Sequence, residues 1–123
     1  MKSLLIVAHG SRREASNEEV RHLAKLIADS QNCEFAEVSA AFLEIAEPSI
    51  PQGLEDCIKR GASEVVVFPY FLAAGRHVVE DIPAEILPVV EKYPGVKVRL
   101  ASHLGLSSQL PDVILEITDR VES

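Results

Sequence analysis

The sequence predicts an α/β fold in which a four-stranded parallel sheet is flanked by helices. Continuous apolar runs of strand length occur at residues 4–7 and 65–68, as is typical of strands that are buried on both faces. Between such runs the apolar residues follow helical spacing, so that strand and helix patterns alternate four times. The chain has 123 residues, which predicts one domain spanning residues 1–123.

The first strand is expected at Lys2 to Ala8, because its centre is continuously apolar. The first helix is expected to open at Ser16, since Glu19 follows three residues later as in a capping box. The apolar residues of that helix recur at i, i+3, i+4 and i+7 and form one face: Val20, Leu23, Ala24 and Ile27.

The second strand is expected at Phe35 to Phe42. Ser49 and Gln52 have the spacing that opens a second helix, and Gly61 is placed to end this helix in a left-handed conformation. The remaining elements are expected as a strand at 65–68, a loop at 70–79, a helix at 82–92, a strand at 96–100 and a final helix from Pro111. The final helix carries four apolar residues on a shared face, at Val113, Ile114, Ile117 and Val121.

Right-handed crossovers leave few topologies for such a chain. We expect the strand order 2-1-3-4, which is the order of a flavodoxin-like half. This order has a topological switch point between the first and third strands, and open α/β sheets bind ligands outside the carboxyl ends of their strands at such a point.

Two histidines are expected at this switch point. His9 comes directly after the first strand, and His77 lies in the loop after the third. Two imidazoles that meet there could bind a metal ion or perform acid–base chemistry, although each could also be an ordinary loop histidine. His103 follows the fourth strand and could line the same crevice.

Carboxylates and a glycine accompany these histidines. Glu44 follows the second strand and could be a third metal ligand, a proton acceptor or a solvated surface group. Glu80 and Asp81 could orient the imidazole of His77, or could simply favour the start of the third helix. Gly10 allows a sharp turn or a close approach of ligand.

Polar and flexible residues flank the same region and are candidates for binding an anionic ligand. Arg12, Arg13 and Arg76 could hold carboxylates through their guanidinium groups, or could be surface charges. Ser11 could contact an anion or cap the following segment, and Gly75 would let its loop fold over a ligand.

The composition argues against several classes of function. The net charge of −7 disfavours binding to nucleic acid, and no apolar run approaches the ~18 residues of a membrane span. The apolar run from Met1 to Ala8 is too short for a signal peptide. Cys33 and Cys57 are isolated, as expected of free thiols in a reducing compartment. We therefore expect a cytoplasmic protein.

Three segments resemble the motifs of the sirohydrochlorin chelatases, which are class II tetrapyrrole chelatases. They are the histidine-containing run at 5–12, the segment at 41–50 and the stretch at 69–83, of which the last is the most specific. The resemblance covers nearly the whole chain in matching order. Ala8 departs from it, because many relatives have glycine there.

The resemblance implies insertion of a divalent metal into sirohydrochlorin without ATP, as in a sirohydrochlorin cobaltochelatase. It assigns the metal to His9 and His77, and Glu44 resembles a metal-ligating glutamate of longer relatives. Co²⁺ is then a substrate, with Ni²⁺ or Fe²⁺ as alternatives, and no cofactor is permanently bound. Short members of the family act as homodimers, which agrees with size: a tetrapyrrole needs a large pocket, and one four-stranded unit offers only one wall.

Other functions stay open at this point. A metal or tetrapyrrole carrier would use the same residues for binding alone. A phosphoryl-transfer enzyme is less consistent with the sequence, because no G-x-x-x-x-G-K-[ST] loop is present and the arginine follows the histidine. A purely structural α/β module is a further alternative.

Overall fold

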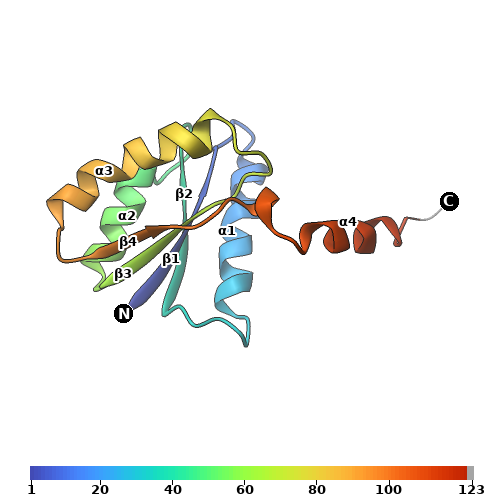
Figure 1. Cartoon of the computed structure of the whole chain (residues 1–123), viewed down its shortest axis with the longest axis horizontal. Coiled ribbons are helices and arrows are strands. Elements are labelled where there is room, and N and C mark those ends of the chain that lie inside the picture. The colour runs from blue at the N-terminus through green and yellow to red at the C-terminus, as the bar shows by residue number, and fades with distance from the viewer. Residues whose placement is uncertain (122–123) are drawn as a thin grey trace.

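The computed structural model describes residues 1–121. Its centre is a parallel sheet with the strand order β2-β1-β3-β4 (Figure 1). The strands are β1 (Lys2–Ala8), β2 (Glu37–Phe42), β3 (Glu64–Pro69) and β4 (Lys97–Leu100). The predicted fold class and strand order are confirmed, and the strand bounds differ from those expected by two residues at most.

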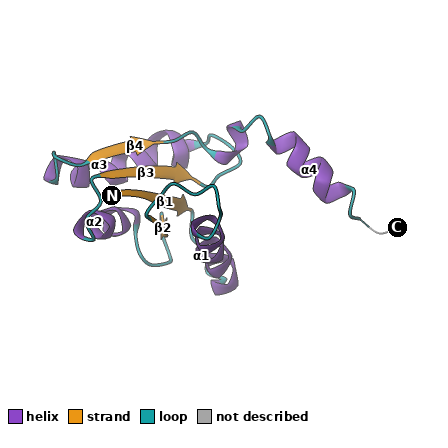
Figure 2. Ribbon diagram, turned by 90° about the horizontal axis from the view of Figure 1, so that it is seen from below, coloured by secondary structure: helices purple, strands orange, loops and turns teal. Residues whose placement is uncertain are grey.

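Three helices pack on the sheet, one on one face and two on the other (Figures 1 and 2). They are α1 (Glu14–Ala28), α2 (Ile50–Lys59) and α3 (Ile82–Lys92), and the other helical elements are the π-helical turn η1 (His77–Asp81), the 3-10 turn η2 (Leu104–Leu106) and α4 (Leu110–Thr118). No helix within residues 1–121 has the length and apolarity needed to cross a membrane.

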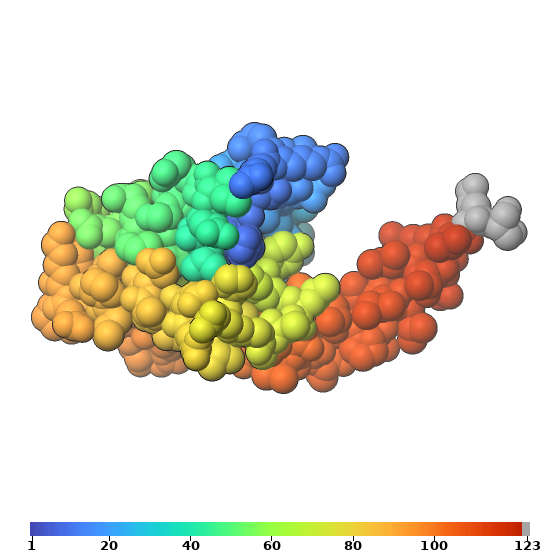
Figure 3. Space-filling view, turned by 90° about the horizontal axis from the view of Figure 1, so that it is seen from above, coloured from blue at the N-terminus to red at the C-terminus, as the bar shows by residue number. Residues whose placement is uncertain are grey.

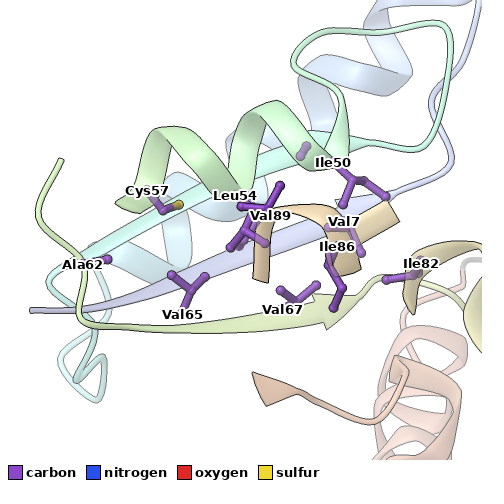
Figure 4. Packing of buried hydrophobic residues seen from close by; sticks show 12 residues of the cluster. Val7, Ile50, Leu54, Cys57, Ala62, Val65, Val67, Ile82, Ile86 and Val89 are labelled. Carbon is purple, nitrogen blue, oxygen red and sulfur yellow. The ribbon is translucent and has the colours of Figure 1, made fainter. Parts of the chain in front are cut away.

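The alternation of side chains along β1 divides the core into two layers. Leu5 and Val7 face α2 and α3, where they join a fully buried cluster that includes Leu54 and Ile82 (Figure 4). The intervening side chains of β1, such as Ile6, face α1 on the other side of the sheet. Because β1 is buried on both faces, the loop that leaves its carboxyl end starts from a rigid position.

The start of α1 differs from the expected capping box. The helix begins at Glu14 rather than at Ser16. Its buried residue Asn17 holds the preceding turn instead: the Asn17 side chain accepts a hydrogen bond from the Ser11 amide (2.9 Å) and donates one to the Ser11 carbonyl (2.8 Å). This side-chain amide, which bonds both the backbone N–H and the carbonyl of Ser11, replaces the predicted cap between Ser16 and Glu19.

The other predicted helix ends agree with the structure. The hydroxyl of Ser49 accepts the amide of Gln52 at the start of α2 (3.3 Å), and Gly61 follows that helix with a φ of +109°. The expected loop at 70–79 ends earlier than predicted, because His77 already begins the π-helical turn that continues into α3.

Helix α4, unlike the other three helices, does not pack on the sheet. It projects from the body of the molecule (Figures 1, 2 and 3), and its main contacts are with η2. The apolar face predicted for this helix is exposed, at 52% for Ile114 and 60% for Ile117. Val121, which was predicted to share that face, lies beyond the end of the helix at Thr118.

Candidate functional site

The carboxyl ends of three adjacent strands bring the predicted site residues together. His9 follows β1, Glu44 lies two residues beyond β2, and His77 begins η1 in the segment after β3. Since β1 lies between β2 and β3, these segments meet above one edge of the sheet. The ring centroids of His9 and His77 are 4.9 Å apart with an angle of 64° between the planes, so the predicted convergence of the two imidazoles is confirmed.

The separation of the two rings fits a shared metal ion. An imidazole nitrogen binds a divalent ion such as Zn²⁺ at about 2.1 Å, which places the ring centroid roughly 3.3 Å from the ion. Two rings bound to one ion at about 90° to 110° then have centroids roughly 4.7 to 5.4 Å apart. The observed 4.9 Å falls within this interval, so the spacing of the two rings is compatible with a shared ion.

The π-helical turn η1 sets the orientation of His77. It places Asp81 four residues after His77, and the Nδ1 of His77 lies 2.8 Å from the Oδ2 of Asp81. Since a carboxylate only accepts hydrogen bonds, Nδ1–H donates and the Nε2 lone pair is left for a ligand. The neighbouring Glu80 instead contacts Arg76, Nε to Oε2, at 3.1 Å. Of the two acids considered in the sequence, Asp81 is therefore the one that holds the imidazole.

His9 has the same hydrogen-bonding arrangement with a backbone partner. Its Nδ1 lies 3.0 Å from the Gly10 carbonyl, so Nδ1–H donates and Nε2 is again the free atom. That Nε2 is 3.1 Å from Oε1 of Glu44. A neutral Nε2 and a carboxylate are both acceptors, so this approach is favourable only with positive charge between them. A proton can supply that charge, and so can a metal ion.

A tight backbone contact fixes Glu44 beside His9. Gly10 has a φ of +94°, and a Cβ at this residue would lie 1.9 Å from the Glu44 carbonyl oxygen. The Glu44 amide donates to the His9 carbonyl (3.1 Å), and the next residue, Ile45, takes a left-handed φ of +72°. Gly10 thus has the predicted role of a turn glycine and also lets the β2 loop of the same chain approach closely, while its approach to a ligand stays a prediction.

An open hollow of about 470 Å³ lies beside these groups. Its lining includes His77 together with three carboxylates, those of Glu44, Asp81 and Glu85. Acidic side chains around a concave surface raise the local concentration of cations. The hollow therefore favours a divalent cation, whereas a polycarboxylate ligand would need cationic groups from elsewhere.

Several residues of this region are not evident from the sequence patterns. Phe71 lies against His77, with ring centroids 6.3 Å apart, and Leu43, Ala84 and Glu85 line the hollow. Ala84 and Glu85 were missed because the sequence did not indicate the π-helical turn that joins His77 to α3. Because η1 runs directly into α3, these residues stand three and four positions after Asp81 and share its side of the helix.

The other predicted binding residues lie near the site without contacting the histidines. The Ser11 hydroxyl accepts the amide of Arg13 (3.0 Å), which is the capping role. Arg12 and Gly75 are exposed, and the Arg76 side chain is 81% exposed. Their predicted contacts with a tetrapyrrole stay predictions.

The three-ligand metal set is not preassembled. Within residues 1–121 no group of three or more histidine, cysteine, aspartate or glutamate side chains is arranged to hold a metal ion. Glu44 contacts His9, and its predicted role as a ligand beside His77 stays a prediction.

Comparison with known proteins identifies the family. The CbiX family profile matches residues 3–121 of the chain. The chain belongs to the CbiX family. Among curated relatives, the sirohydrochlorin ferrochelatase of Priestia megaterium is 34% identical over 94% of this chain, and the match spans only 43% of that relative. The sirohydrochlorin cobaltochelatase of Sulfolobus acidocaldarius is 31% identical over 100% of this chain and 94% of its own length.

A solved structure agrees with this family membership. SirB from Bacillus subtilis with Fe3+ superposes with a TM-score of 0.85 and 28% identity, covering 98% of this chain and 48% of that chain. The CbiX-family chain thus has the length of one relative and spans about half the length of others.

Proposed function

We propose that this CbiX-family protein inserts a divalent metal ion, with Co²⁺ as the first candidate, into sirohydrochlorin without ATP. The observation that carries the proposal is the pair of imidazoles 4.9 Å apart whose Nδ1 atoms are both engaged. Nε2 of each ring is thereby the atom that remains for a metal ligand, and in His9 it lies 3.1 Å from Oε1 of Glu44. The relatives named as sirohydrochlorin chelatases support the choice of substrate.

The reaction requires the exchange of one divalent ion for two pyrrole protons. Sirohydrochlorin gives up two N–H protons, the four ring nitrogens bind the metal, and the protons must be accepted outside the macrocycle. In the proposed mechanism, His9 and His77 bind the incoming ion through Nε2 while other coordination positions stay open. As the ion passes to the ring, each Nε2 lone pair becomes free and can accept one proton.

The paired carboxylates support this exchange. Glu44 lies 3.1 Å from Nε2 of His9, and Asp81 lies 2.8 Å from Nδ1 of His77. Each carboxylate stabilises the imidazolium that forms when its histidine takes a pyrrole proton. The site thus contains two histidine–carboxylate pairs for the two protons.

Which divalent ion is inserted is a separate question from the type of reaction. Imidazole ligands accept cobalt, nickel and iron, and the order of affinity does not decide which ion is used. Relatives carry the names of both cobaltochelatases and ferrochelatases. Cobalt is proposed because the Sulfolobus acidocaldarius relative, which this chain matches over 94% of the relative's own length, bears the cobalt name.

The proposed active form is a homodimer. A hollow of about 470 Å³, open to the surface, offers one wall for a macrocycle, whereas ligand sites commonly enclose most of a ligand's surface. Longer relatives match this chain over about half their length, so a second copy is proposed to supply the opposite wall of the cleft.

The test is anaerobic insertion of Co²⁺, Ni²⁺ or Fe²⁺ into sirohydrochlorin, followed by the absorbance of the macrocycle. We expect multiple turnovers by the wild type and at least ~100-fold slower insertion in His9→Ala and His77→Ala. His22→Ala is the matched control, because His22 is an exposed histidine of α1, and should keep the wild-type rate. Undiminished turnover in either site variant would contradict the proposal, and one stoichiometric turnover would indicate a carrier.

A further inference from the structure

Two loops of the site are joined by side chains of α1 that lie outside the hollow. His9 belongs to the turn that follows β1, and Glu44 belongs to the loop between β2 and α2. Nε2 of His9 and Oε1 of Glu44 lie 3.1 Å apart, although the two side chains are 42% and 58% exposed. Because packing does not enclose either group, their separation depends on how the two backbone segments are held.

The turn that carries His9 is held by Asn17, a residue of α1 that is only 2% exposed. Its side chain accepts a hydrogen bond from the Ser11 amide (2.9 Å) and donates one to the Ser11 carbonyl (2.8 Å). The same side-chain nitrogen also donates to Oε2 of Glu14, at 3.2 Å. A buried amide with all of these partners has a fixed orientation, and it fixes the turn to which it is bonded.

The loop that carries Glu44 is held from the same helix by Arg21. Nη2 of Arg21 donates to the Glu47 carbonyl at 3.0 Å, three residues beyond Glu44. The guanidinium carbon also lies 5.1 Å from the ring centroid of Phe42, the last residue of β2. The Phe42 amide closes the base of the loop by donating to the Pro48 carbonyl (2.9 Å). Arg21 therefore contacts both the outer backbone of the loop and the strand end from which it starts.

Glu14 connects these two sets of contacts. Its Oε1 accepts Nη1 of Arg21 at 2.7 Å, while its Oε2 accepts the Asn17 side chain. The hydrogen bond from Arg21, followed by that from Asn17, lowers the pKa of the Glu14 carboxyl, so the group is ionised at neutral pH. Glu14 is 68% exposed, and such a pair adds little stability, but it fixes the direction of the guanidinium. We call this hydrogen-bonded set, Asn17, Glu14 and Arg21, the α1 clamp.

We propose that Arg21 is a positioning residue of the proposed metal insertion. Through the α1 clamp it holds the Glu44 loop against the turn of His9, so that the Glu44 carboxylate reaches the imidazole. Within residues 1–121, Arg21 bonds neither of these residues and does not line the hollow. It therefore acts on the metal site through the Glu44 loop. The inference rests on the proposed function and extends its requirements to α1.

Arginine suits this role because its planar guanidinium has donors that point in different directions. Nη1 reaches the acids of α1, Glu14 and Glu18, while Nη2 reaches the Glu47 carbonyl. A lysine ammonium is a single point charge on a flexible stem, which does not reproduce a fork of this kind. Arg21→Lys therefore removes the geometry of the clamp without changing the net charge.

The first experiment compares Arg21→Lys with a matched control, Arg60→Lys. Arg60 also joins a helix to β2, with Nε 2.6 Å from Oε1 of Glu37, but Glu37 is at the opposite end of that strand from the Glu44 loop. Calorimetric titration of Co²⁺ should give about tenfold weaker binding for Arg21→Lys and wild-type binding for Arg60→Lys. Circular dichroism should show that both variants are folded. Equal losses in the two variants, or wild-type affinity in Arg21→Lys, would overturn the inference.

A double-mutant cycle with Glu44→Gln distinguishes positioning from a purely structural role. If Arg21 acts through Glu44, Arg21→Lys should cost about tenfold in Co²⁺ affinity when Glu44 is present and less than about twofold in the Glu44→Gln background. The same factor in both backgrounds would mean a general loosening of the fold and would overturn the inference. Insertion assays should show a lower kcat with an unchanged KM for sirohydrochlorin, because Arg21 lies outside the hollow.

A spectroscopic measurement keeps the inference separate from the proposed function. In the metal-free protein, the nitrogen resonance of Nε2 of His9 reports the contact with Glu44 and needs no turnover. It should shift in Arg21→Lys and stay in place in Arg60→Lys. A wild type that inserts no metal would contradict the proposed function, while such a shift would still support the positioning of Glu44 by Arg21. Insertion by the wild type with an unchanged His9 resonance in Arg21→Lys would overturn the inference alone.

Discussion

Replacing Asp81 by asparagine should weaken Co²⁺ binding about tenfold. The carboxylate of Asp81 holds Nδ1 of His77 at 2.8 Å, and the asparagine can still accept that hydrogen bond but carries no charge. Loss of such an outer partner typically lowers metal affinity by about 10- to 100-fold. The Asp81 side chain is 39% exposed, so solvent screens the charge and the lower limit applies, which corresponds to about 1.4 kcal/mol.

The control for this prediction lies one residue away. Glu80→Gln removes the same charge from the adjacent residue, but Glu80 contacts Arg76 rather than His77. Isothermal titration of Co²⁺ into both variants should give a loss of about tenfold for Asp81→Asn and little change for Glu80→Gln. Equal losses in the two variants would mean that only the net charge matters, and the proposed orientation of His77 would be refuted.

Three further predictions concern the scaffold around the site. Gly10→Ala should lower the free energy of unfolding by about 1 to 2 kcal/mol or more. Gly10 has a φ of +94°, and the added Cβ would meet the Glu44 carbonyl. A variant that is as stable as the wild type in urea unfolding would contradict this. Ser3→Ala should stabilise the fold by roughly 1 kcal/mol, because the Ser3 hydroxyl is buried and has no hydrogen-bond partner within residues 1–121; a lower melting temperature than that of the wild type would contradict this. Burial raises the pKa of the Cys57 thiol, so maleimide should modify Cys33 on the order of tenfold faster than Cys57 in the folded protein, and similar rates read by mass spectrometry would argue against that burial.

The features that follow from local sequence could be predicted. Apolar runs such as residues 65–68 identify strands, and the right-handed crossover rule leaves few topologies, among which the flavodoxin-like order was the one expected. The meeting of His9 and His77 follows from that order, because each residue lies beyond the carboxyl end of a neighbouring strand. This inference uses only the order of the strands and not the contacts between side chains, so it could be made from the sequence alone.

Features that depend on contacts between distant residues could not be predicted. The spacing of Ser16 and Glu19 matches a capping box, yet the buried Asn17 binds the preceding turn and the helix starts earlier. Likewise, the close contact of Gly10 is with the carbonyl of Glu44, a residue from another strand's loop. In both cases a tertiary hydrogen bond or contact prevails over the local signal.

The position of α4 has a different cause. The periodicity of Val113, Ile114 and Ile117 shows that one side of the helix is apolar, and the structure leaves this side exposed. The spacing of apolar residues identifies an apolar face, but it does not say which surface, if any, that face packs against. The sequence therefore identified the helix and its face, but it did not predict that the helix leaves its own sheet.

The most direct test of the account is X-ray absorption spectroscopy of the protein loaded with one Co²⁺ per chain. If His9 and His77 bind the same ion, the wild-type spectrum should contain the scattering of two imidazoles, and His9→Ala and His77→Ala should each retain one. A wild-type cobalt shell without imidazole, or one that neither substitution changes, would contradict the shared ion on which the proposed chemistry depends.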